Sequence, residues 1–101
     1  MDFVKPNENG FTVYTKTGCS YCIKAKILLS NYRHSSTTTI IECDEYIDSS
    51  RNDFLEFIKI QTGIEYKTFP IIFHNGKFIG GYTELKIYID KESAFNMDTS
   101  F

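Results

Sequence analysis

The chain has 101 residues, a formal net charge of −2 and hydrophobic residues at 42% of its positions. This hydrophobic fraction argues against intrinsic disorder, and the length suits a single domain, residues 1–101, with its own core. The small net charge gives no reason to expect a nucleic-acid partner or an anionic membrane surface, and no apolar run reaches the ~20 residues that span a bilayer.

The first two thirds of the chain predict two strands and two helices in alternation. Residues 1–10 are polar, end in Asn-Gly and predict a loose lead-in. Residues 11–15 predict a hydrophobic strand, and apolar side chains at three-and-four spacing predict a helix over 20–32. The β-branched run at 37–41 predicts a buried strand. A second helical pattern covers 48–63, with Ser50 as its cap in a capping box with Asp53.

The last third predicts a hairpin and a third helix. Residues 71–74 and 77–79 flank Asn75-Gly76, a strong signal for a tight hairpin turn. Gly80-Gly81 then interrupts the second strand, and Thr83 is the expected cap of the helix that follows. The order strand, helix, strand, helix, hairpin, helix predicts an α/β, thioredoxin-like fold, with a four-stranded mixed sheet flanked by three or more helices.

The pair Cys19 and Cys22 lies where the first strand turns into the first helix. A cysteine at a helix N-terminus has its sulfur near unpaired N–H groups and the positive end of the helix dipole, and both favour the nucleophilic thiolate. The second sulfur, on the first helical turn, is close enough to form a disulfide with it. We therefore interpret the two residues as a redox pair; a structural disulfide, half a metal site and two core cysteines are the alternatives.

The other candidate ligands and thiols are weaker. His34 and His74 combine with the cysteine pair in none of the usual zinc spacings. Cys43 stands between Glu42 and Asp44, whose charges would raise the pKa of its thiol, so we expect it to be inert. Three cysteines with one close pair do not match a secreted disulfide framework, and the N-terminus lacks a signal-peptide pattern, so we expect a cytoplasmic protein.

Three blocks of the sequence resemble the glutaredoxin family. The segment Thr15–Cys22 is similar to the family's active-site segment, Thr68–Pro70 to the segment ahead of its hairpin, and Gly80–Leu85 to the segment after it. The blocks follow one another at family spacing, and the absence of tryptophan is unlike thioredoxin proper. The resemblance implies a monomeric oxidoreductase that uses glutathione as co-substrate and reduces protein disulfides and glutathione mixed disulfides.

The resemblance assigns roles to both cysteines and to a nearby cation. Cys19 would be the thiolate that attacks the substrate disulfide, and Cys22 would be the resolving thiol. Glutathione carries two carboxylates and one ammonium group, so its site needs cationic or N–H groups at two ends and an anion at the third. Lys16 would bind the glycine carboxylate, assisted by Gln61 or Lys67.

The second block would present backbone groups to glutathione. In the family the bond before the proline is cis, so the resemblance implies a cis Phe69–Pro70 bond. Thr68, Phe69 and Pro70 would then pair with the cysteinyl unit of glutathione in the manner of an added strand. An ordinary turn proline is the alternative. Tyr21 would pack beside bound glutathione, or else is simply a half-buried aromatic residue.

The third block would bind the γ-glutamyl end of glutathione. Gly81 would allow close backbone approach, and the N–H groups at Thr83 and Glu84 would bind the carboxylate at a helix N-terminus. The Glu84 side chain would pair with the ammonium group, or would serve as a favourable acidic residue in a first helical turn. The family more often has aspartate at this position.

Ser20 departs from the proline that many dithiol glutaredoxins have after the first cysteine. Some members with serine there hold a [2Fe–2S] cluster between two subunits with the help of glutathione, and Cys19 would then be a metal ligand in a cluster-bridged dimer. A redoxin reduced by a flavoprotein of the thioredoxin reductase type is a third hypothesis. The carboxylate sites expected at Lys16 and Thr83 disfavour it.

Overall fold

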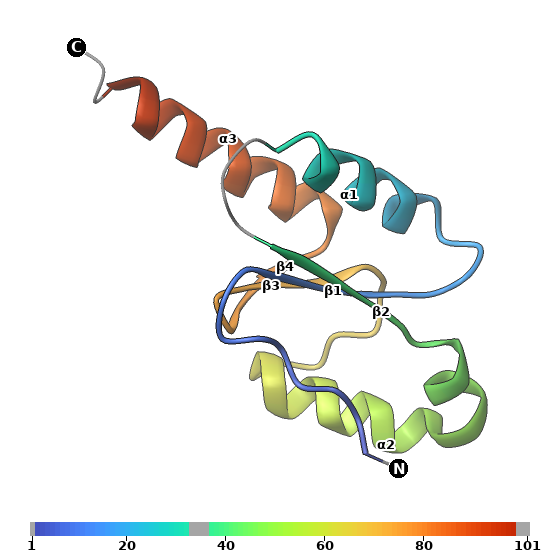
Figure 1. The fold of residues 1–101 in the computed structure, drawn as a ribbon. Helices are drawn as coiled ribbons and strands as arrows, with labels where there is room; N and C mark the ends of the chain where they lie inside the picture. Colours follow the sequence, from blue (N-terminus) through green and yellow to red (C-terminus); the bar gives the residue numbers. More distant parts are fainter. Residues whose placement is uncertain (1, 33–36, 99–101) are drawn as a thin grey trace.

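The computed structural model describes residues 2–32 and 37–98, with side chains as far as residue 92. One sheet contains the strands β1 (Phe11–Thr15), β2 (Thr38–Glu42), β3 (Ile71–His74) and β4 (Lys77–Gly80). The helices are α1 (Ser20–Ser30), α2 (Asp44–Thr62) and α3 (Tyr82–Asp98). Figure 1 shows α1 and α3 on one face of the sheet and α2 on the other.

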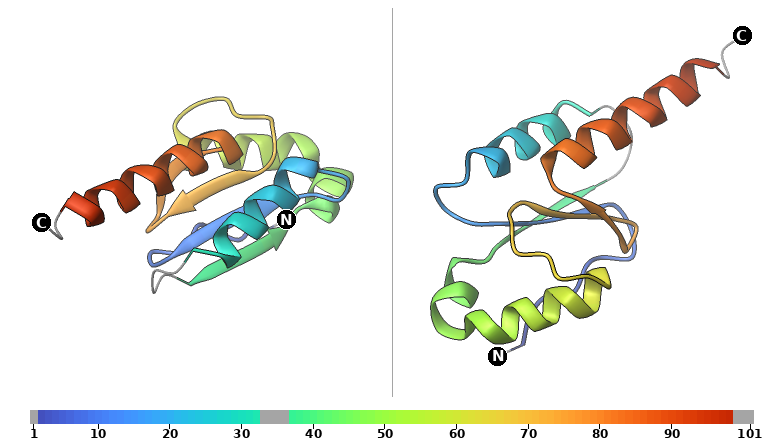
Figure 2. Two further views of the ribbon diagram at one scale, coloured as in Figure 1. Left: turned by 90° about the horizontal axis from the view of Figure 1, so that it is seen from above. Right: turned by 180° about the vertical axis from the view of Figure 1, so that it is seen from behind.

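The strands lie in the order β2-β1-β3-β4. β1 pairs in parallel with β2 and antiparallel with β3, while β3 and β4 form an antiparallel hairpin. Asn75 and Gly76 have positive φ values of 52° and 80°, as a tight hairpin turn requires. The views in Figure 2 show the helices in separate layers on either side of this sheet. The prediction of an α/β, thioredoxin-like fold with a four-stranded mixed sheet is confirmed.

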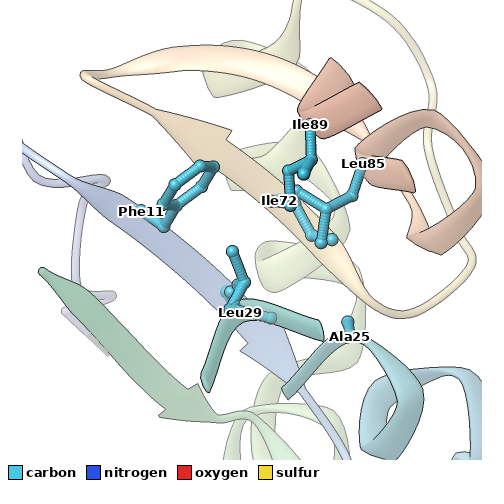
Figure 3. Packing of buried hydrophobic residues seen from close by; sticks show 7 residues of the cluster. Phe11, Ala25, Leu29, Ile72, Leu85 and Ile89 are labelled. Atoms are coloured by element: carbon cyan, nitrogen blue, oxygen red, sulfur yellow. The ribbon is translucent and has the colours of Figure 1, made fainter. Parts of the chain in front are cut away.

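Side chains of β1 and β3 alternate between the two faces of the sheet and build two cores. The core beneath α1 and α3 (Figure 3) consists of Phe11, Val13, Ala25, Leu29, Ile72, Leu85 and Ile89. The core against α2 consists of Tyr14, Ile41, Cys43, Phe54, Ile58, Ile71 and Phe73. The first core holds both helices whose N-termini lie at the candidate site, so packing of the sheet also fixes the site.

β2 is an edge strand, which corrects the prediction of a buried strand at 37–41. Thr38 and Ile40 are exposed, and only Ile41 is buried. The reason is its place in the sheet, because among the described strands only β1 lies beside it. β-branched residues suit a half-exposed pleated surface as well as a buried one, so composition alone does not distinguish the two.

α2 begins at Asp44, four residues before the predicted start at 48. The backbone leaves the helical region at Ser50, with φ −151° and ψ 49°, the residue proposed as the cap. The predicted helix start is therefore a kink inside a longer helical segment. The predicted end is confirmed, because Gly63 has φ 81° and donates its N–H to the Lys59 carbonyl oxygen at 2.8 Å.

Residues 2–10 form neither helix nor strand, but this lead-in contacts the rest of the protein through Phe3 and Val4. The ring of Phe3 packs edge-on against Tyr46, with centroids 4.9 Å apart. The hydroxyl of Tyr14 donates to the Val4 carbonyl oxygen at 2.6 Å. One aromatic residue among polar neighbours is enough to fix the segment on the α2 core, a contact that no local pattern indicates.

Candidate active site

The turn between β1 and α1 brings Cys19 to the N-cap position of α1. Gly18 has φ 76°, a left-handed conformation that glycine adopts without strain. Cys19 then has the extended backbone of an N-cap, with φ −104° and ψ 105°. The sulfur of Cys19 therefore lies at the end of the helix where N–H groups are free and the dipole is positive.

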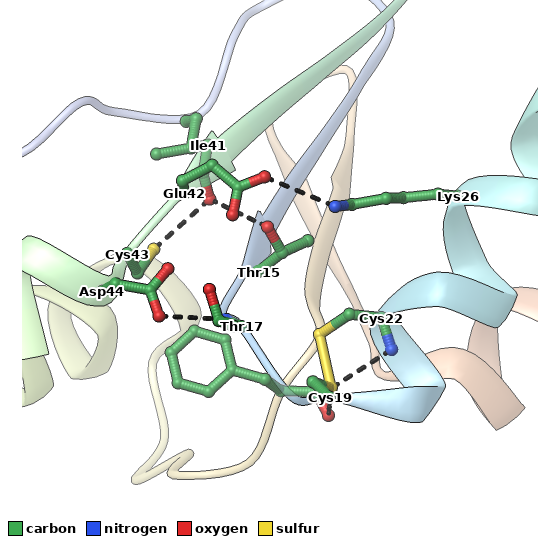
Figure 4. Close-up of a disulfide and its surroundings, with 10 residues drawn as sticks. Thr15, Thr17, Cys19, Cys22, Lys26, Ile41, Glu42, Cys43 and Asp44 are labelled. Atoms are coloured by element: carbon green, nitrogen blue, oxygen red, sulfur yellow. Dashed lines mark hydrogen bonds and ion pairs between the residues drawn. A yellow bond between two sulfur atoms is a disulfide. The ribbon is translucent and has the colours of Figure 1, made fainter.

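A disulfide joins Cys19 to Cys22 (Figure 4). Their Cα atoms are 5.2 Å apart, within the range that disulfides require. The Cys22 N–H donates to the Cys19 Sγ at 3.1 Å, and in the reduced protein the same N–H would stabilise a Cys19 thiolate. Cys22 is buried, whereas Cys19 is partly exposed. Cys19 is thus the sulfur that an external reactant can reach.

The second sequence block lies against the disulfide. The Phe69–Pro70 bond is cis, as the resemblance implied. The Phe69 carbonyl oxygen lies 3.6 Å from the Cys19 Sγ. Pro70 is buried, Thr68 is exposed, and Phe69 is half-buried with its ring stacked on Phe54 at a centroid distance of 6.2 Å. The loop before β3 therefore presents backbone groups beside the accessible sulfur.

Cations gather on the α2 side of the same loop. Lys16 Nζ lies 5.7 Å from the centroid of the Phe69 ring. Lys16, Arg51 and Lys67 line one cavity of about 140 Å³, together with the acidic residues Asp44 and Asp48 and the apolar residues Ile47, Phe54, Leu55 and Phe69. Lys67, rather than Gln61, thus shares this cavity with Lys16. Sequence reasoning missed Arg51, which the kink in α2 directly precedes.

The third block forms the start of α3. Gly80, directly before Gly81, has φ 134°, a conformation that glycine adopts without strain. Gly81 N–H donates to the Glu84 Oε1 at 2.8 Å, and Leu85 N–H donates to the Gly81 carbonyl oxygen at 3.0 Å. Gly81 is therefore the N-cap, and the prediction of Thr83 as the cap is wrong because Thr83 already lies inside the first turn.

Gly81 also lies in a confined space. A Cβ at this position would approach the Tyr66 hydroxyl to 2.9 Å. A side chain at position 81 would therefore collide with Tyr66, while the close approach of glutathione to Gly81 stays a prediction. Glu84 is an acidic residue in the first turn of α3, which was one of its two interpretations, and its carboxylate accepts the Gly81 N–H there.

Tyr21 and Tyr82 lie together near the disulfide. Tyr21 is 54% exposed, so it does not belong to the core, and its ring centroid is 6.0 Å from that of Tyr82. Lys24 Nζ lies 5.1 Å from the Tyr21 centroid. Tyr82 was not singled out from the sequence, although its place directly after two glycines at a helix start was a usable signal.

Cys43 has the opposite environment to Cys19. It is fully buried, and burial raises the pKa of its thiol to about 12, with smaller contributions from the charges of Asp44 and Glu42. A hydrogen bond with the Thr15 backbone acts in the other direction. The expectation that flanking carboxylates raise this pKa is confirmed, but burial is the larger cause.

Two further observations concern metals and membranes. Within residues 2–32 and 37–92, no three His, Cys, Asp or Glu side chains come together as a metal site would need. His34 lies outside the described residues, and His74 Nδ1 is 2.6 Å from the Tyr88 hydroxyl. Of the helices that the structure describes, none has the length and apolar character to cross a bilayer.

The sequence matches a known family and its curated relatives. Residues 11–79 match the family model for glutaredoxin. The human protein named glutaredoxin-2, mitochondrial, is 35% identical over 78 residues, which are 77% of this chain and 44% of that protein. Chicken glutaredoxin-1 is 29% identical over 83 residues, 81% of this chain and 75% of that protein. The chain thus spans less than half the length of the human mitochondrial relative.

Solved structures give the same result. Glutaredoxin 1 from Francisella tularensis, complexed with cacodylate, superimposes with a TM-score of 0.64 at 30% identity and covers 84% of this chain and 96% of that one. The buckwheat glutaredoxin–glutathione complex has a TM-score of 0.68 at 28% identity and covers 93% and 80% of the two chains. With the matched family model and the Cys19–Cys22 disulfide at the start of α1, the chain belongs to the glutaredoxin family.

Proposed function

We propose that the protein is a glutathione-dependent thiol–disulfide oxidoreductase that reduces glutathione mixed disulfides and protein disulfides. The observation that carries the proposal is the sulfur of Cys19, which is accessible, capped by the Cys22 N–H at 3.1 Å and 3.6 Å from the Phe69 carbonyl oxygen. A thiolate at this position is a nucleophile for disulfide exchange, and the neighbouring backbone groups suit a peptide-like substrate.

The reaction on a glutathionylated protein needs Cys19 alone. Its thiolate attacks the glutathione sulfur of the mixed disulfide, a new sulfur–sulfur bond forms, and the client cysteine leaves as a thiolate that takes up a proton. A second glutathione, as thiolate, then attacks the glutathione sulfur on Cys19. Glutathione disulfide leaves, and the Cys19 thiolate is restored.

The reaction on a protein disulfide uses both cysteines. Cys19 forms a mixed disulfide with one client sulfur, and the Cys22 thiolate attacks the Cys19 Sγ to release the second client thiol. The two electrons lost by the enzyme thiols reduce the client disulfide. Two glutathione molecules reopen the Cys19–Cys22 disulfide, which is the state seen in the structure.

Two groups of residues offer binding partners for the two carboxylates of glutathione as the co-substrate. Lys16, Arg51 and Lys67 around one cavity offer cations to the glycine carboxylate. The first turn of α3 offers the N–H groups of Thr83 and Glu84 to the γ-glutamyl carboxylate.

Glu84 and Tyr21 complete this proposed site. Glu84 Oε1 accepts the Gly81 N–H, which leaves the second carboxylate oxygen for the ammonium group of glutathione. Exposed Tyr21 offers an aromatic surface beside Cys19.

The test is a glutathione-coupled assay on a glutathionylated peptide, with Cys19→Ser and Cys22→Ser in parallel. We expect Cys19→Ser to abolish deglutathionylation and Cys22→Ser to retain it, because only the first sulfur is needed for that substrate. Cys22→Ser should fail on a protein disulfide. Activity that survives in Cys19→Ser, or that is lost in both variants, would contradict the proposed roles.

Two other hypotheses lead to different outcomes. A [2Fe–2S] carrier purified without oxygen would be coloured and dimeric, and its colour would disappear in Cys19→Ser. The cluster ligands other than the Cys19 sulfur would come from glutathione and the second subunit. A redoxin of the thioredoxin type would turn over with a thioredoxin reductase in the absence of glutathione. The monomeric state and the cytoplasmic location expected from the sequence stay predictions.

A further inference from the structure

The loop that carries Lys16 and leads to Cys19 is tied to α2 by one carboxylate. Thr17 N–H donates to Asp44 Oδ1 at 3.0 Å, and Asp44 is the first residue of α2 (Figure 4). The two residues are 27 positions apart in the chain. The neighbouring backbone is joined as well, because Cys43 N–H donates to the Thr15 carbonyl oxygen at 2.8 Å.

The Asp44–Thr17 hydrogen bond joins the backbone of this loop to a charged side chain. Asp44 also lines the cavity that contains Lys16, so its carboxylate faces both the loop backbone and the cation. The Thr17 N–H is the first cause that holds the pKa of Asp44 below its usual value, and the charge of Lys16 acts in the same direction. Asp44 is therefore ionised at neutral pH and accepts a charge-assisted hydrogen bond.

Because of Gly18, the Asp44–Thr17 hydrogen bond matters for the position of Cys19. Gly18 separates Thr17 from Cys19 and has φ 76°, and apart from these two neighbours no described residue comes within 4 Å of the place where a Cβ would lie. Packing therefore does not hold the loop at this residue. A glycine without neighbouring contacts leaves the backbone free to change conformation unless a neighbour fixes it. On the β1 side of Gly18, the adjacent backbone is held by the hydrogen bond from the Thr17 N–H to Asp44.

We propose that Asp44 is a positioning residue for the glutaredoxin reaction. Its carboxylate accepts the Thr17 N–H and so holds the Lys16–Gly18 loop, which keeps Cys19 and Lys16 in fixed positions relative to each other. In this proposal Asp44 acts through the loop rather than on the reacting sulfur. The proposal rests on the proposed function for the role of Lys16. The part that concerns Cys19 is independent of glutathione.

The variants separate hydrogen bonding from charge. Asp44→Ala removes the acceptor and the charge, whereas Asp44→Asn keeps an Oδ1 acceptor and removes only the charge. Glu45→Ala is the matched control, because Glu45 is the other acidic residue of the first turn of α2 and is exposed. It reports any general effect of the charge at the helix N-terminus.

The first readout is alkylation of the reduced protein by iodoacetamide across pH 5–9, without glutathione, with each cysteine quantified by peptide mass spectrometry. We expect Asp44→Ala to slow alkylation of Cys19 at pH 7 about threefold or more and to raise its apparent pKa, since one charge-assisted hydrogen bond is lost. Asp44→Asn and Glu45→Ala should stay within about twofold of the parent protein. Alkylation of buried Cys43 should not increase in any of them.

Three outcomes would overturn the proposal. The first is an unchanged rate of Cys19 alkylation in Asp44→Ala. The second is an equal loss of that rate in Asp44→Asn or Glu45→Ala, and the third is a parallel rise in Cys43 labelling, which marks unfolding. The second readout is steady-state deglutathionylation, in which Asp44→Ala should raise KM more than it lowers kcat, through misplaced Lys16. If the parent protein has no such activity, the proposed function fails while the alkylation result still decides the role of Asp44 toward Cys19.

Discussion

Two cysteines in this chain stand at the N-cap of a helix, Cys19 before α1 and Cys43 before α2. Both follow a strand of the same parallel pair, yet their sulfurs meet different surroundings. Cys19 Sγ accepts an N–H at 3.1 Å and is partly exposed. Cys43 has no side-chain cap hydrogen bond, is fully buried, and its Sγ contacts the Ile41 carbonyl oxygen at 3.5 Å.

The comparison separates what a helix N-terminus provides from what a reactive thiol needs. The positive end of a helix dipole is available to both sulfurs, but burial and two flanking carboxylates raise the pKa of Cys43 to about 12. A directed N–H and access to water, in addition to the helix end, distinguish Cys19. Each of the following tests acts on one of these differences.

The largest expected effect concerns catalysis. Cys19→Ser should lower glutathione-coupled disulfide reduction at least about a hundredfold, because a serine hydroxyl does not exchange with disulfides. Cys43→Ala should keep the rate within about twofold, because this sulfur does not reach substrate. Steady-state rates at equal folded concentration check this, and a Cys43→Ala variant as inactive as Cys19→Ser would break the comparison.

The second effect concerns labelling of the thiols themselves. At pH 8 a thiol with a pKa of about 12 is ionised to only ~10⁻⁴. In the reduced native protein we expect iodoacetamide to modify Cys19 at least about a hundredfold faster than Cys43. The difference should collapse in denaturing urea, which is the control. Comparable native rates would show that burial does not protect Cys43.

The third effect is on stability at alkaline pH. Burial raises the pKa of Cys43 from 9.0 to about 12, so the unfolded chain loses this proton at lower pH than the folded protein does. Its contribution is fully present below about pH 9 and is lost as pH rises toward 12. By pH 10 the free energy of unfolding should fall by about 1 kcal/mol on this account.

Urea unfolding of the parent protein and of Cys43→Ala at pH 7.5 and pH 10 measures this loss. The variant should lose less stability than the parent between the two pH values. Burial, the main cause of the raised pKa of Tyr14, acts in both proteins, whereas the smaller contribution of Cys43 to that pKa is absent from the variant and adds to the difference. Parallel losses in the two proteins would assign the alkaline instability to other groups.

The smallest effect concerns the carboxylates that flank Cys43. Glu42→Gln removes one of them and also an exposed ion pair with Lys26, whose atoms are 3.4 Å apart. We expect the free energy of unfolding to change by less than about 0.5 kcal/mol. Cys43 should still react at least about tenfold more slowly than Cys19, because burial is the larger cause of its raised pKa. A Cys43 that becomes reactive in Glu42→Gln would reverse that order of causes.

Features that depend on local chemistry could be predicted from the sequence. Asn75-Gly76 requires positive φ values, and a cysteine pair at a strand-to-helix junction requires an N-cap sulfur, so both follow from a few adjacent residues. The cis bond before Pro70 came from resemblance, because most bonds of this kind are trans.

Features that join distant segments could not be predicted in the same way. The Asp44–Thr17 hydrogen bond spans 27 positions, and the place of Arg51 in the cavity with Lys16 depends on a kink in α2. The packing of Phe3 on the α2 core likewise depends on where the N-terminal segment crosses that core. Such contacts leave no periodicity or motif, since each one is set by the arrangement of whole elements.

The most direct test is to find which sulfur glutathione modifies. The reduced Cys22→Ser variant, which retains Cys19 and Cys43 but has no resolving thiol, is incubated with glutathione disulfide and mapped by peptide mass spectrometry. We expect one glutathione adduct per chain, on Cys19, that is removed by added glutathione. An adduct on Cys43, or none on Cys19 in folded protein, would contradict the division between the two helix N-caps.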